Sequence, residues 1–355
     1  MKFKIGKNKI GNGEKVYFIA DIAANHDGDI KRALKLIELA KESGADAAKF
    51  QHHNVSRYVS DFGFKNLKKK MSHQKKWKKS IFEVYKDAEV PKSWTLSLKK
   101  KCEEVGIDFF STPYDLDMVD HLNPFVKAFK IGSGDVAWDE MLIKVSKKKK
   151  PVFFATGAAT LEEVKNAYKI ISKNNSKFCI MQCNTNYTGS IENFKFINLN
   201  VLKKYKKIFP KALLGLSDHT PGHETVLGAV AMGAQAIEKH FTDDTSRSGP
   251  DHAFSIDYAG WKDMVERSRE LELSLGTEIK KIEDNELETS VIQRRSIRTK
   301  RLIKKNEILT EDMVINLRPC PKDALEPWKL KLILGKKVLQ DIPAGDYLKA
   351  SDIAQ

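Results

Sequence analysis

Cysteine is scarce in this chain, with four residues in 355. These cysteines show neither C-x-x-C spacing nor the dense framework of a disulfide-stapled secreted domain, so we expect a reducing, cytoplasmic environment. Cys179 and Cys183 fall within an apolar run. We expect both to be core or site-adjacent residues rather than partners in a disulfide.

Long apolar segments are also missing. No stretch reaches the length that a membrane-spanning helix needs, and the first residues, MKFKIGKNKIGNG, contain no apolar core of a signal peptide. Secretion and membrane insertion are therefore not expected.

The chain has fewer acidic than basic residues, which gives it a net charge of +15. A basic protein can bind nucleic acid, an acidic membrane surface or an anionic small substrate. The sequence contains no aromatic RNA-binding motif, zinc-finger spacing or leucine zipper. We interpret the lysine clusters at 65–79, 147–150 and 203–207 as solvated surface, and nucleic-acid binding remains a weaker alternative.

Short apolar runs of strand length are abundant and alternate with amphipathic segments of helical period. Helices are expected at 29–44, ending at Gly44, at 160–173, opening with a Thr160–Glu163 capping box, and at 220–234. The strands are expected at 16–23, 45–51, 108–115, 128–135, 151–157, 178–183, 213–219 and 236–242. This order predicts a (β/α)8 barrel, and the competing doubly wound sheet lacks a GxGxxG after its first strand.

The character of the chain changes near residue 285. Short β-like runs follow around SIRTKRLI, MVINLRP, KKVLQDI and DYLKA. We predict a catalytic barrel over residues 1–284 and a small, mainly β domain over 285–355.

The predicted strands begin apolar and end polar, as in AIEKHFT at 236–242. In (β/α)8 barrels the active site lies at the carboxyl ends of the strands, so these endings are candidate site residues. They include Asp21, Lys49, Gln51, Thr112, Lys130, Ser133, Thr156, Gln182, Ser217, Asp218, His219, Glu238, Lys239 and His240.

Two histidines end consecutive strands. His219 and His240 could converge on one divalent transition ion, completed by oxygen ligands and water. Alternatively, both rings hydrogen-bond the substrate directly.

Three lysines, Lys49, Lys130 and Lys239, also lie at strand ends, close to several hydroxyl residues. Ammonium and hydroxyl groups together suit a phosphate or a carboxylate. The alternative for each lysine is that its side chain only extends to solvent.

Further polar groups follow the first and last strands. DIAANHDGD presents Asp21, Asn25 and His26, although Asn25, Asp27 or Asp29 could instead cap the next helix. Asp135 is a second candidate for proton transfer. The loop SGPDHAFSID, 248–257, can direct Asp251 and His252 over the mouth of the barrel.

These motifs together resemble the sialic acid synthase family, which condenses phosphoenolpyruvate with an amino-sugar aldose. FIADIAANHDGD, KFQ, FKIGSGD, LGLSDHT and EKHFTDD…GPDHAFS appear in the family's order, and the ending LGKKVLQDIPAGDYL resembles its antifreeze-like (SAF) domain. The resemblance covers nearly the whole chain.

The resemblance implies a set of ligand contacts. His219 and His240 would carry Mn²⁺, with Mg²⁺ or Co²⁺ as alternatives, and the ion would act as a Lewis acid on the aldehyde oxygen. Phosphoenolpyruvate would contact Lys49, Thr112, Lys130, Ser133, Thr156 and Ser217. The sugar would contact Gln51, Tyr187, Asp251 and Arg318, the last from the partner subunit of a homodimer.

The chain departs from the family pattern at three places. Asp21 and Asp135 stand where many members have Glu; Asp135 is our first candidate, and Asp21 the second, for activating the water that adds to C2. The segment 182–200 is also atypical, with Thr188 in place of a proline. N-acetylmannosamine is therefore the default substrate, and a 2,4-diacetamido-trideoxyhexose, leading to a legionaminic- or pseudaminic-type acid, is the alternative.

Two other functions stay open. A Schiff-base aldolase could use Lys49, Lys130 or Lys239 as its nucleophile. A non-catalytic protein that binds glycans or nucleic acid is the third hypothesis.

Overall fold

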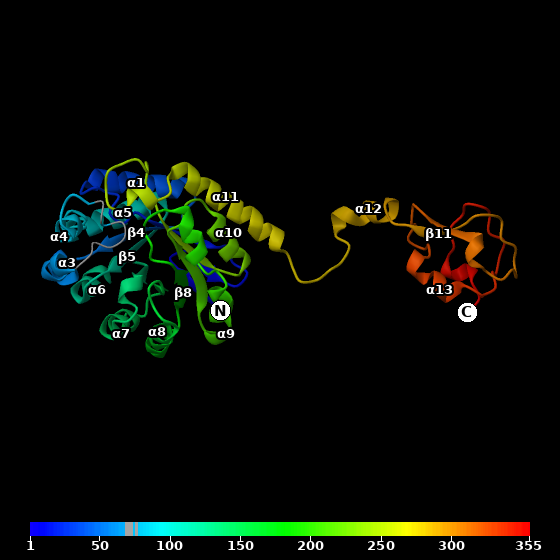
Figure 1. Ribbon diagram of the computed structural model, residues 1–355, viewed down its shortest axis with the longest axis horizontal. Helices are drawn as coiled ribbons and strands as arrows, with labels where there is room; N and C mark the ends of the chain where they lie inside the picture. The colour runs from blue at the N-terminus through cyan, green and yellow to red at the C-terminus, as the bar shows by residue number, and fades with distance from the viewer. Residues whose placement is uncertain (68–73, 75–76) are drawn as a thin grey trace. The chain divides into compact units, whose positions relative to one another are not determined.

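The computed structural model describes residues 1–67, 74 and 77–355. Part of the lysine cluster at 65–79 therefore lies outside the described residues. The chain divides into two compact units, Met1–Gly276 and Thr277–Gln355. Each unit is described by itself, and both are drawn in Figure 1.

The first unit is a closed eight-stranded parallel barrel, in which β10 pairs with both β9 and β3. This confirms the (β/α)8 prediction, and every strand lies within a predicted run except β4, which extends one residue beyond the predicted 45–51. The strands are β3 (Tyr17–Asp21), β4 (Ala47–His52), β5 (Asp108–Pro113), β6 (Ala128–Ile131), β7 (Val152–Ala155), β8 (Phe178–Cys183), β9 (Leu213–Asp218) and β10 (Ala236–His240).

Helices surround this barrel (Figure 1). Asp29, not Asn25 or Asp27, caps the first of them by accepting from the backbone N–H of Lys31, and the Thr160–Glu163 capping box is present. The helices are α1 (Ile30–Glu42), α2 (Val55–Tyr58), α3 (Asp61–Asn66), α4 (Ile81–Asp87), α5 (Thr95–Val105), α6 (Leu116–Leu122), α7 (Asp139–Lys147), α8 (Leu161–Asn174), α9 (Val201–Ile208), α10 (Glu224–Ala231) and α11 (Tyr258–Leu275).

An antiparallel hairpin that the sequence analysis did not predict closes the amino-terminal end of the barrel. It consists of β1 (Lys2–Ile5) and β2 (Asn8–Gly11). Phe3, Ile5 and Ile10 join the apolar cluster inside the barrel, where the rings of Phe3 and Phe153 meet edge to face with centroids 6.2 Å apart. The interior of the lower barrel is therefore packed, and the polar strand endings lie at its carboxyl end.

Residues along each strand alternate between the barrel interior and the surrounding helices. In β10, Ala236 belongs to the interior cluster, whereas Ile237 belongs to the layer between strands and helices. The same alternation places Glu238 and His240 inward and Lys239 outward. Strand parity thus decides which polar strand endings face a common site.

The second unit has a small antiparallel sheet, β11 (Ser296–Thr299) with β12 (Val314–Leu317). It is preceded by α12 (Leu287–Ile292) and contains α13 (Leu330–Ile333). The predicted runs KKVLQDI and DYLKA form isolated β-bridges, such as Ile303 with Ile342, rather than further strands. A separate apolar core that includes Ile297, Leu309 and Val338 holds the unit together.

Two further expectations concern the whole chain. Within the described part of the chain, no helix has the length and apolar character to cross a membrane. All four cysteines there are buried and unpaired, and Cys179 and Cys183 belong to the interior cluster, as expected.

Candidate active site

A layer of buried polar side chains fills the barrel above the packed lower end. Its members come from inward-facing positions on six strands and the turns that follow them. They are Asp21, Lys49, the half-buried Gln51, Thr112, Lys130, Ser217, His219, Glu238 and His240. The structure therefore brings together most of the residues that the sequence analysis assigned to a site.

Lys49 forms the first ion pair of this layer. Its ammonium Nζ lies 2.7 Å from Asp21 Oδ2 and 3.5 Å from Glu238 Oε1, and it donates to Thr112 Oγ1 at 3.3 Å. The side chain is only 2% exposed, which excludes the alternative that it extends to solvent. Burial lowers the pKa of Lys49, but the carboxylates of Asp21 and Glu238 outweigh burial, so the net pKa is raised and the amine stays charged.

Glu238 is the centre of the second ion pair. Its Oε1 lies 3.0 Å from Lys130 Nζ and accepts a hydrogen bond from Ser217 Oγ at 3.2 Å. Burial raises the pKa of this carboxyl, but Lys130 and Lys49 outweigh it and bring the pKa to about 2. Glu238 Oε2 is buried and has no hydrogen-bond partner among the described residues, which leaves one acceptor for a ligand, a water or a proton.

Lys239 corrects one expectation. The sequence analysis grouped it with Lys49 and Lys130, but its outward parity places it between the barrel and the helices. There its Nζ lies 2.5 Å from Asp218 Oδ2 and donates to the carbonyl of Thr220. Lys239 therefore does not belong to the inward polar layer.

Two of the expected hydroxyls occupy different environments. Ser133, in the turn after β6, accepts from the backbone N–H of Gly157 at 3.0 Å and so lies near the end of β7. Thr156 donates to the carbonyl of Met181 and accepts from the phenol of Tyr205 on α9. The structure thus directs the Thr156 hydroxyl toward the helices and not toward Lys49 and Lys130.

The two predicted histidines face one another at the mouth, with ring centroids 5.4 Å apart. Nδ1–H of His219 donates to the carbonyl of Asn184 at 2.9 Å, which leaves Nε2 with its lone pair. His240 Nε2 lies 3.6 Å from Asp21 Oδ2, and its buried Nδ1 has no hydrogen-bond partner within the described chain. The rings therefore converge as the strand order predicted.

Both imidazoles are held neutral. Burial, followed by the neighbouring His240, lowers the pKa of His219 to about 3, and burial, followed by Lys49, does the same for His240. Neutral imidazole with a fixed second nitrogen is the form that binds a metal ion. The described residues contain no group of three or more His, Cys, Asp or Glu side chains that could hold an ion, so these rings fit a metal only as two ligands of a set completed by water or substrate.

Aromatic rings pack beside the histidines. Tyr187 meets His219 edge to face with centroids 4.5 Å apart, and Phe254 meets His240 in the same way at 4.9 Å. Tyr187 belongs to the atypical 182–200 segment, whose 3₁₀ turn spans Ile191–Phe196. This segment thus reaches the mouth of the barrel through Tyr187.

A pocket opens from His240 toward the segment between β4 and α5. Gln51, at its base, donates to Asp21 Oδ2 at 3.1 Å. The rings of Tyr58 and Tyr114 pack in a tilted arrangement with centroids 4.5 Å apart, and Tyr58 meets Tyr85 edge to face at 5.3 Å. The described lining residues are Ala23, Ala24, Gln51, His53, Tyr58, Trp77, Val84, Tyr85, Ala88, Tyr114, Tyr187, His240, Pro250 and Asp251.

Two further carboxylates border the mouth. Asp251 Oδ2 lies 3.9 Å from His240 Nδ1, and Asp135 has a buried Oδ2 without a hydrogen-bond partner among the described residues. Burial raises the pKa of each carboxyl to about 6. Arg318, the remaining predicted contact, is an exposed residue of the second unit.

One residue that the sequence analysis did not assign to the site, Glu238, follows the same strand parity, and two others do not. Glu238 was noted as a strand ending but was not assigned to the site, although it stands two residues before His240 and therefore faces the same side. Tyr58 and Tyr85 carried no comparable signal, because they lie in short helical segments, 55–58 and 81–87, outside the strand pattern.

Comparison with known proteins identifies the family. Residues 36–280 match the NeuB family, and residues 294–354 match the SAF domain. This chain belongs to the NeuB family of sialic acid synthases. The resemblance that the motifs indicated is therefore confirmed, as is the SAF domain.

The relatives span the chain almost completely. N,N'-diacetyllegionaminic acid synthase of Campylobacter jejuni is 35% identical, over 91% of this chain and 96% of its own length. Human N-acetylneuraminate-9-phosphate synthase is 32% identical, over 96% and 93%. The crystal structure of N-acetylneuraminic acid synthetase from Leptospira borgpetersenii, in complex with citrate, aligns with a TM-score of 0.71 and 28% identity, over 81% of this chain and 95% of that one.

Proposed function

We propose that this NeuB-family protein condenses phosphoenolpyruvate with the open-chain form of an N-acetylated amino-sugar aldose. C3 of phosphoenolpyruvate forms a bond to the aldehyde carbon, whose oxygen takes up a proton. Water adds to C2, and the C2–O bond to phosphate breaks. The products are a nine-carbon 2-keto acid and inorganic phosphate.

The observation that carries this proposal is the buried ion-pair layer beneath two neutral histidines. Lys49 and Lys130 are charged groups in a site almost closed to water, where charge-assisted hydrogen bonds to an anion are strong. Thr112 and Ser217 place hydroxyls beside these ammonium groups. A phosphate and a carboxylate on one small substrate match this arrangement.

The histidines support a metal-assisted reaction. His219 and His240 would hold a divalent ion, for which we propose Mn²⁺ with Mg²⁺ or Co²⁺ as alternatives. When bound, the ion would supply a Lewis acid for the aldehyde oxygen. Asp21, 3.6 Å from His240 and paired to Lys49, holds the lysine next to that position.

A carboxylate is needed to accept the proton from the attacking water. We assign this role first to Asp135, because its buried oxygen is free of hydrogen bonds among the described residues and a pKa of about 6 makes it a better base than an ordinary aspartate. Asp21 is the second candidate. Its hydrogen bonds to Lys49 and Gln51 leave it less free to accept a proton.

The aromatic pocket supports an uncharged sugar with methyl-bearing substituents. Its described lining contains three tyrosines beside Tyr187, one acid, Asp251, and neither lysine nor arginine. Aromatic faces suit C–H groups and acetamido methyls. N-acetylmannosamine remains our default substrate and a 2,4-diacetamido sugar the alternative, with Gln51, Tyr187 and Asp251 as contacts, and Arg318 as a contact from the partner of a cytoplasmic homodimer.

The decisive assay follows phosphate release. We expect release from phosphoenolpyruvate only when both an aldose and a divalent ion are present, tested with N-acetylmannosamine, its 6-phosphate, mannose and 2,4-diacetamido sugars. His240→Ala should abolish turnover and leave the circular dichroism spectrum unchanged. Release that survives exhaustive chelation, or near-normal turnover of His240→Ala, would exclude the metal-assisted reaction.

The Schiff-base alternative is disfavoured by the ion pairs. A lysine nucleophile must lose its proton, but the carboxylates of Asp21 and Glu238 raise the pKa of Lys49. Borohydride in the presence of aldose should therefore trap no covalent adduct on Lys49 or Lys130. An adduct found by mass spectrometry would restore that alternative.

A further inference from the structure

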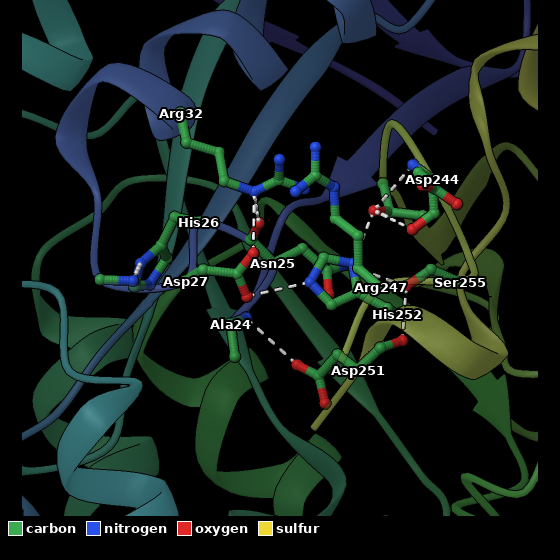
Figure 2. Close-up of polar contacts among 12 residues, drawn as sticks. Ala24, Asn25, His26, Asp27, Arg32, Asp244, Arg247, Asp251, His252 and Ser255 are labelled. Carbon is green, nitrogen blue, oxygen red and sulfur yellow. Dashed lines mark hydrogen bonds and ion pairs between the residues drawn. The ribbon is translucent and has the colours of Figure 1, made fainter. Parts of the chain in front are cut away.

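The loop after the last barrel strand, residues 241–257, is tied to the loop after the first strand, residues 22–29. Figure 2 shows the polar contacts between them. Asn25 Nδ2 donates to the carbonyl of Phe241 and to Ser255 Oγ, both at 2.9 Å. These loops come from neighbouring strands, because β10 pairs with β3. The contacts hold the 241–257 loop at the barrel mouth.

His252 lies at the centre of these contacts and is fully buried. Its Nε2 is 3.0 Å from Asp27 Oδ1, and its Nδ1 is 2.7 Å from the hydroxyl of Thr242. Nε2–H donates to the Asp27 carboxylate, and Nδ1 pairs with the hydroxyl, so both ring nitrogens are used. A Cβ at Gly249 would lie 2.6 Å from His252 Cδ2, which shows how closely the loop backbone packs on this ring.

Asp27 is fixed in turn by Arg32 of α1. Arg32 Nε lies 3.0 Å from Asp27 Oδ2, and its two terminal nitrogens bond both oxygens of Asp243 at the start of the loop. The bidentate guanidinium has a fixed planar geometry. One arginine therefore connects the acceptor of His252 to the beginning of the same loop.

Asp251 is the residue that this arrangement aims at the mouth. Its Oδ2 accepts from the backbone N–H of Ala24 at 3.1 Å and lies 3.9 Å from His240 Nδ1. Its carbonyl accepts from Ser255 Oγ at 2.7 Å. Because His252 is the next residue in the chain, the place of the imidazole fixes the backbone from which Asp251 projects.

We propose that Asp27 and His252 form a positioning pair that sets the Asp251 carboxylate and thereby the affinity for the aldose. The pair acts through Asp251 and touches neither substrate. The inference rests on the proposed function in one respect, the assignment of Asp251 to the sugar. It adds two residues that determine sugar binding from outside the pocket lining.

The test compares His252→Ala, His252→Gln and the control Ser246→Ala in the full chain. Ser246 lies in the same loop, but its hydroxyl bonds only the exposed Asp244 in the described structure. We expect His252→Ala to raise the KM for the aldose about 10- to 100-fold, because the loss of one hydrogen bond between the aldose and the Asp251 carboxylate has about that cost. The KM for phosphoenolpyruvate should stay within about twofold. His252→Gln, which keeps a donor for Asp27, should recover part of the loss, and Ser246→Ala should behave as wild type.

A double-mutant cycle with Asp251→Asn separates positioning from a general structural effect. If His252 acts through Asp251, adding His252→Ala to Asp251→Asn should raise the KM for the aldose little further. An additive increase, or an equal rise in both KM values for His252→Ala alone, would overturn the proposal.

Hydrogen exchange keeps the two proposals distinguishable. Absence of phosphate release by the wild-type protein with every aldose would refute the proposed function. In that case exchange still tests the pair: faster exchange of residues 22–29 and 241–257 in His252→Ala, but not in Ser246→Ala, supports positioning. Unchanged exchange in these segments would overturn it.

Discussion

Strand β10 takes part in a buried lysine–carboxylate pair on each of its faces, outward with Asp218 of β9 and inward with Lys130 of β6, and the two pairs differ in how completely their hydrogen bonds are made. On the outward face, Asp218 Oδ2 receives Lys239 at 2.5 Å and the hydroxyls of Thr220 and Thr225 at 2.8 and 2.9 Å. On the inward face, Glu238 Oε1 receives Lys130 and Ser217, whereas Oε2 has no partner in the described chain.

This difference separates a structural pair from a binding pair. Both occupy interior positions where an unpaired charge is costly, so each carboxylate needs its lysine. In the outward pair, protein groups already bond the Asp218 carboxylate. In the inward pair, Glu238 Oε2 has no partner in the described chain, and the pair borders the mouth. These properties are expected of groups that bind a ligand.

The largest effect is expected from breaking the outward pair. Lys239→Met leaves Asp218 buried without its counter-charge and should lower the free energy of unfolding by about 3–5 kcal/mol. Urea unfolding of the full chain, followed through hydrogen exchange of β9 and β10, measures it. Replacing both partners, Lys239→Met with Asp218→Leu, should restore much of the stability. A single variant as stable as wild type would contradict the structural assignment.

The inward pair should respond in activity more than in stability. Lys130→Met should lower kcat/KM for phosphoenolpyruvate about 10²- to 10³-fold, the usual cost of losing one buried donor to a reacting anion. Glu238 keeps Lys49 at 3.5 Å and Ser217, so unfolding should become easier by less than for Lys239→Met. Phosphate-release kinetics and urea unfolding on the same preparations provide the comparison. A loss of stability equal to that of Lys239→Met, with unchanged kinetics, would remove the distinction.

A measurement at two pH values tests Asp135, a carboxyl group at the barrel mouth that belongs to neither of the two pairs. Its pKa in the folded protein, about 6, exceeds the ordinary 3.8, so the folded state favours the protonated acid. The resulting stability is fully present below about pH 4 and is lost as the pH rises through 6. Asp135→Asn should therefore raise the free energy of unfolding by about 2 kcal/mol at pH 7.5, with little change at pH 4. An equal change at both pH values would show that ionisation is not the cause.

The smallest effect concerns the outward hydroxyls. Tyr205→Phe removes the phenol that donates to Thr156 Oγ1 at 3.1 Å and should cost about 1 kcal/mol of stability. Turnover should be unchanged because this bond lies on the helix side of β7. A tenfold loss of kcat with an unchanged unfolding midpoint would instead place Thr156 in the site.

The barrel could be predicted because parallel strands covered on both faces are nearly continuously apolar and end in polar residues. The β1–β2 hairpin was missed because its apolar residues, Phe3, Ile5 and Ile10, are separated by lysine, glycine and asparagine. In the second unit, KKVLQDI contributes only isolated bridges, whose partners lie in two different segments, Ile303 and Ile308 in one and Ile353 in the other.

The part of the site that could be predicted is the part in which strand order alone determines which side chains lie close together. His219 and His240 converge because their strands are neighbours. The prediction that grouped Lys239 with Lys49 and Lys130 was wrong. Lys239 stands between two inward-facing residues of its strand and must therefore face outward. Thr156 follows the same parity after Ala155. The place of Tyr58 and Tyr85 in the pocket and the contact between Asp27 and His252 could not be predicted. Both depend on how the segments after the strands fold over the mouth.

The sealed lower end of the barrel has a kinetic consequence. Phe3, Ile5 and Ile10 pack into that end, so the described polar layer is approached from the carboxyl ends of the strands. Glu238 stands one inward position deeper than His240 on β10. If two substrates bind at these two levels, we expect the deeper one to bind first and its product to leave last, which product-inhibition patterns would show.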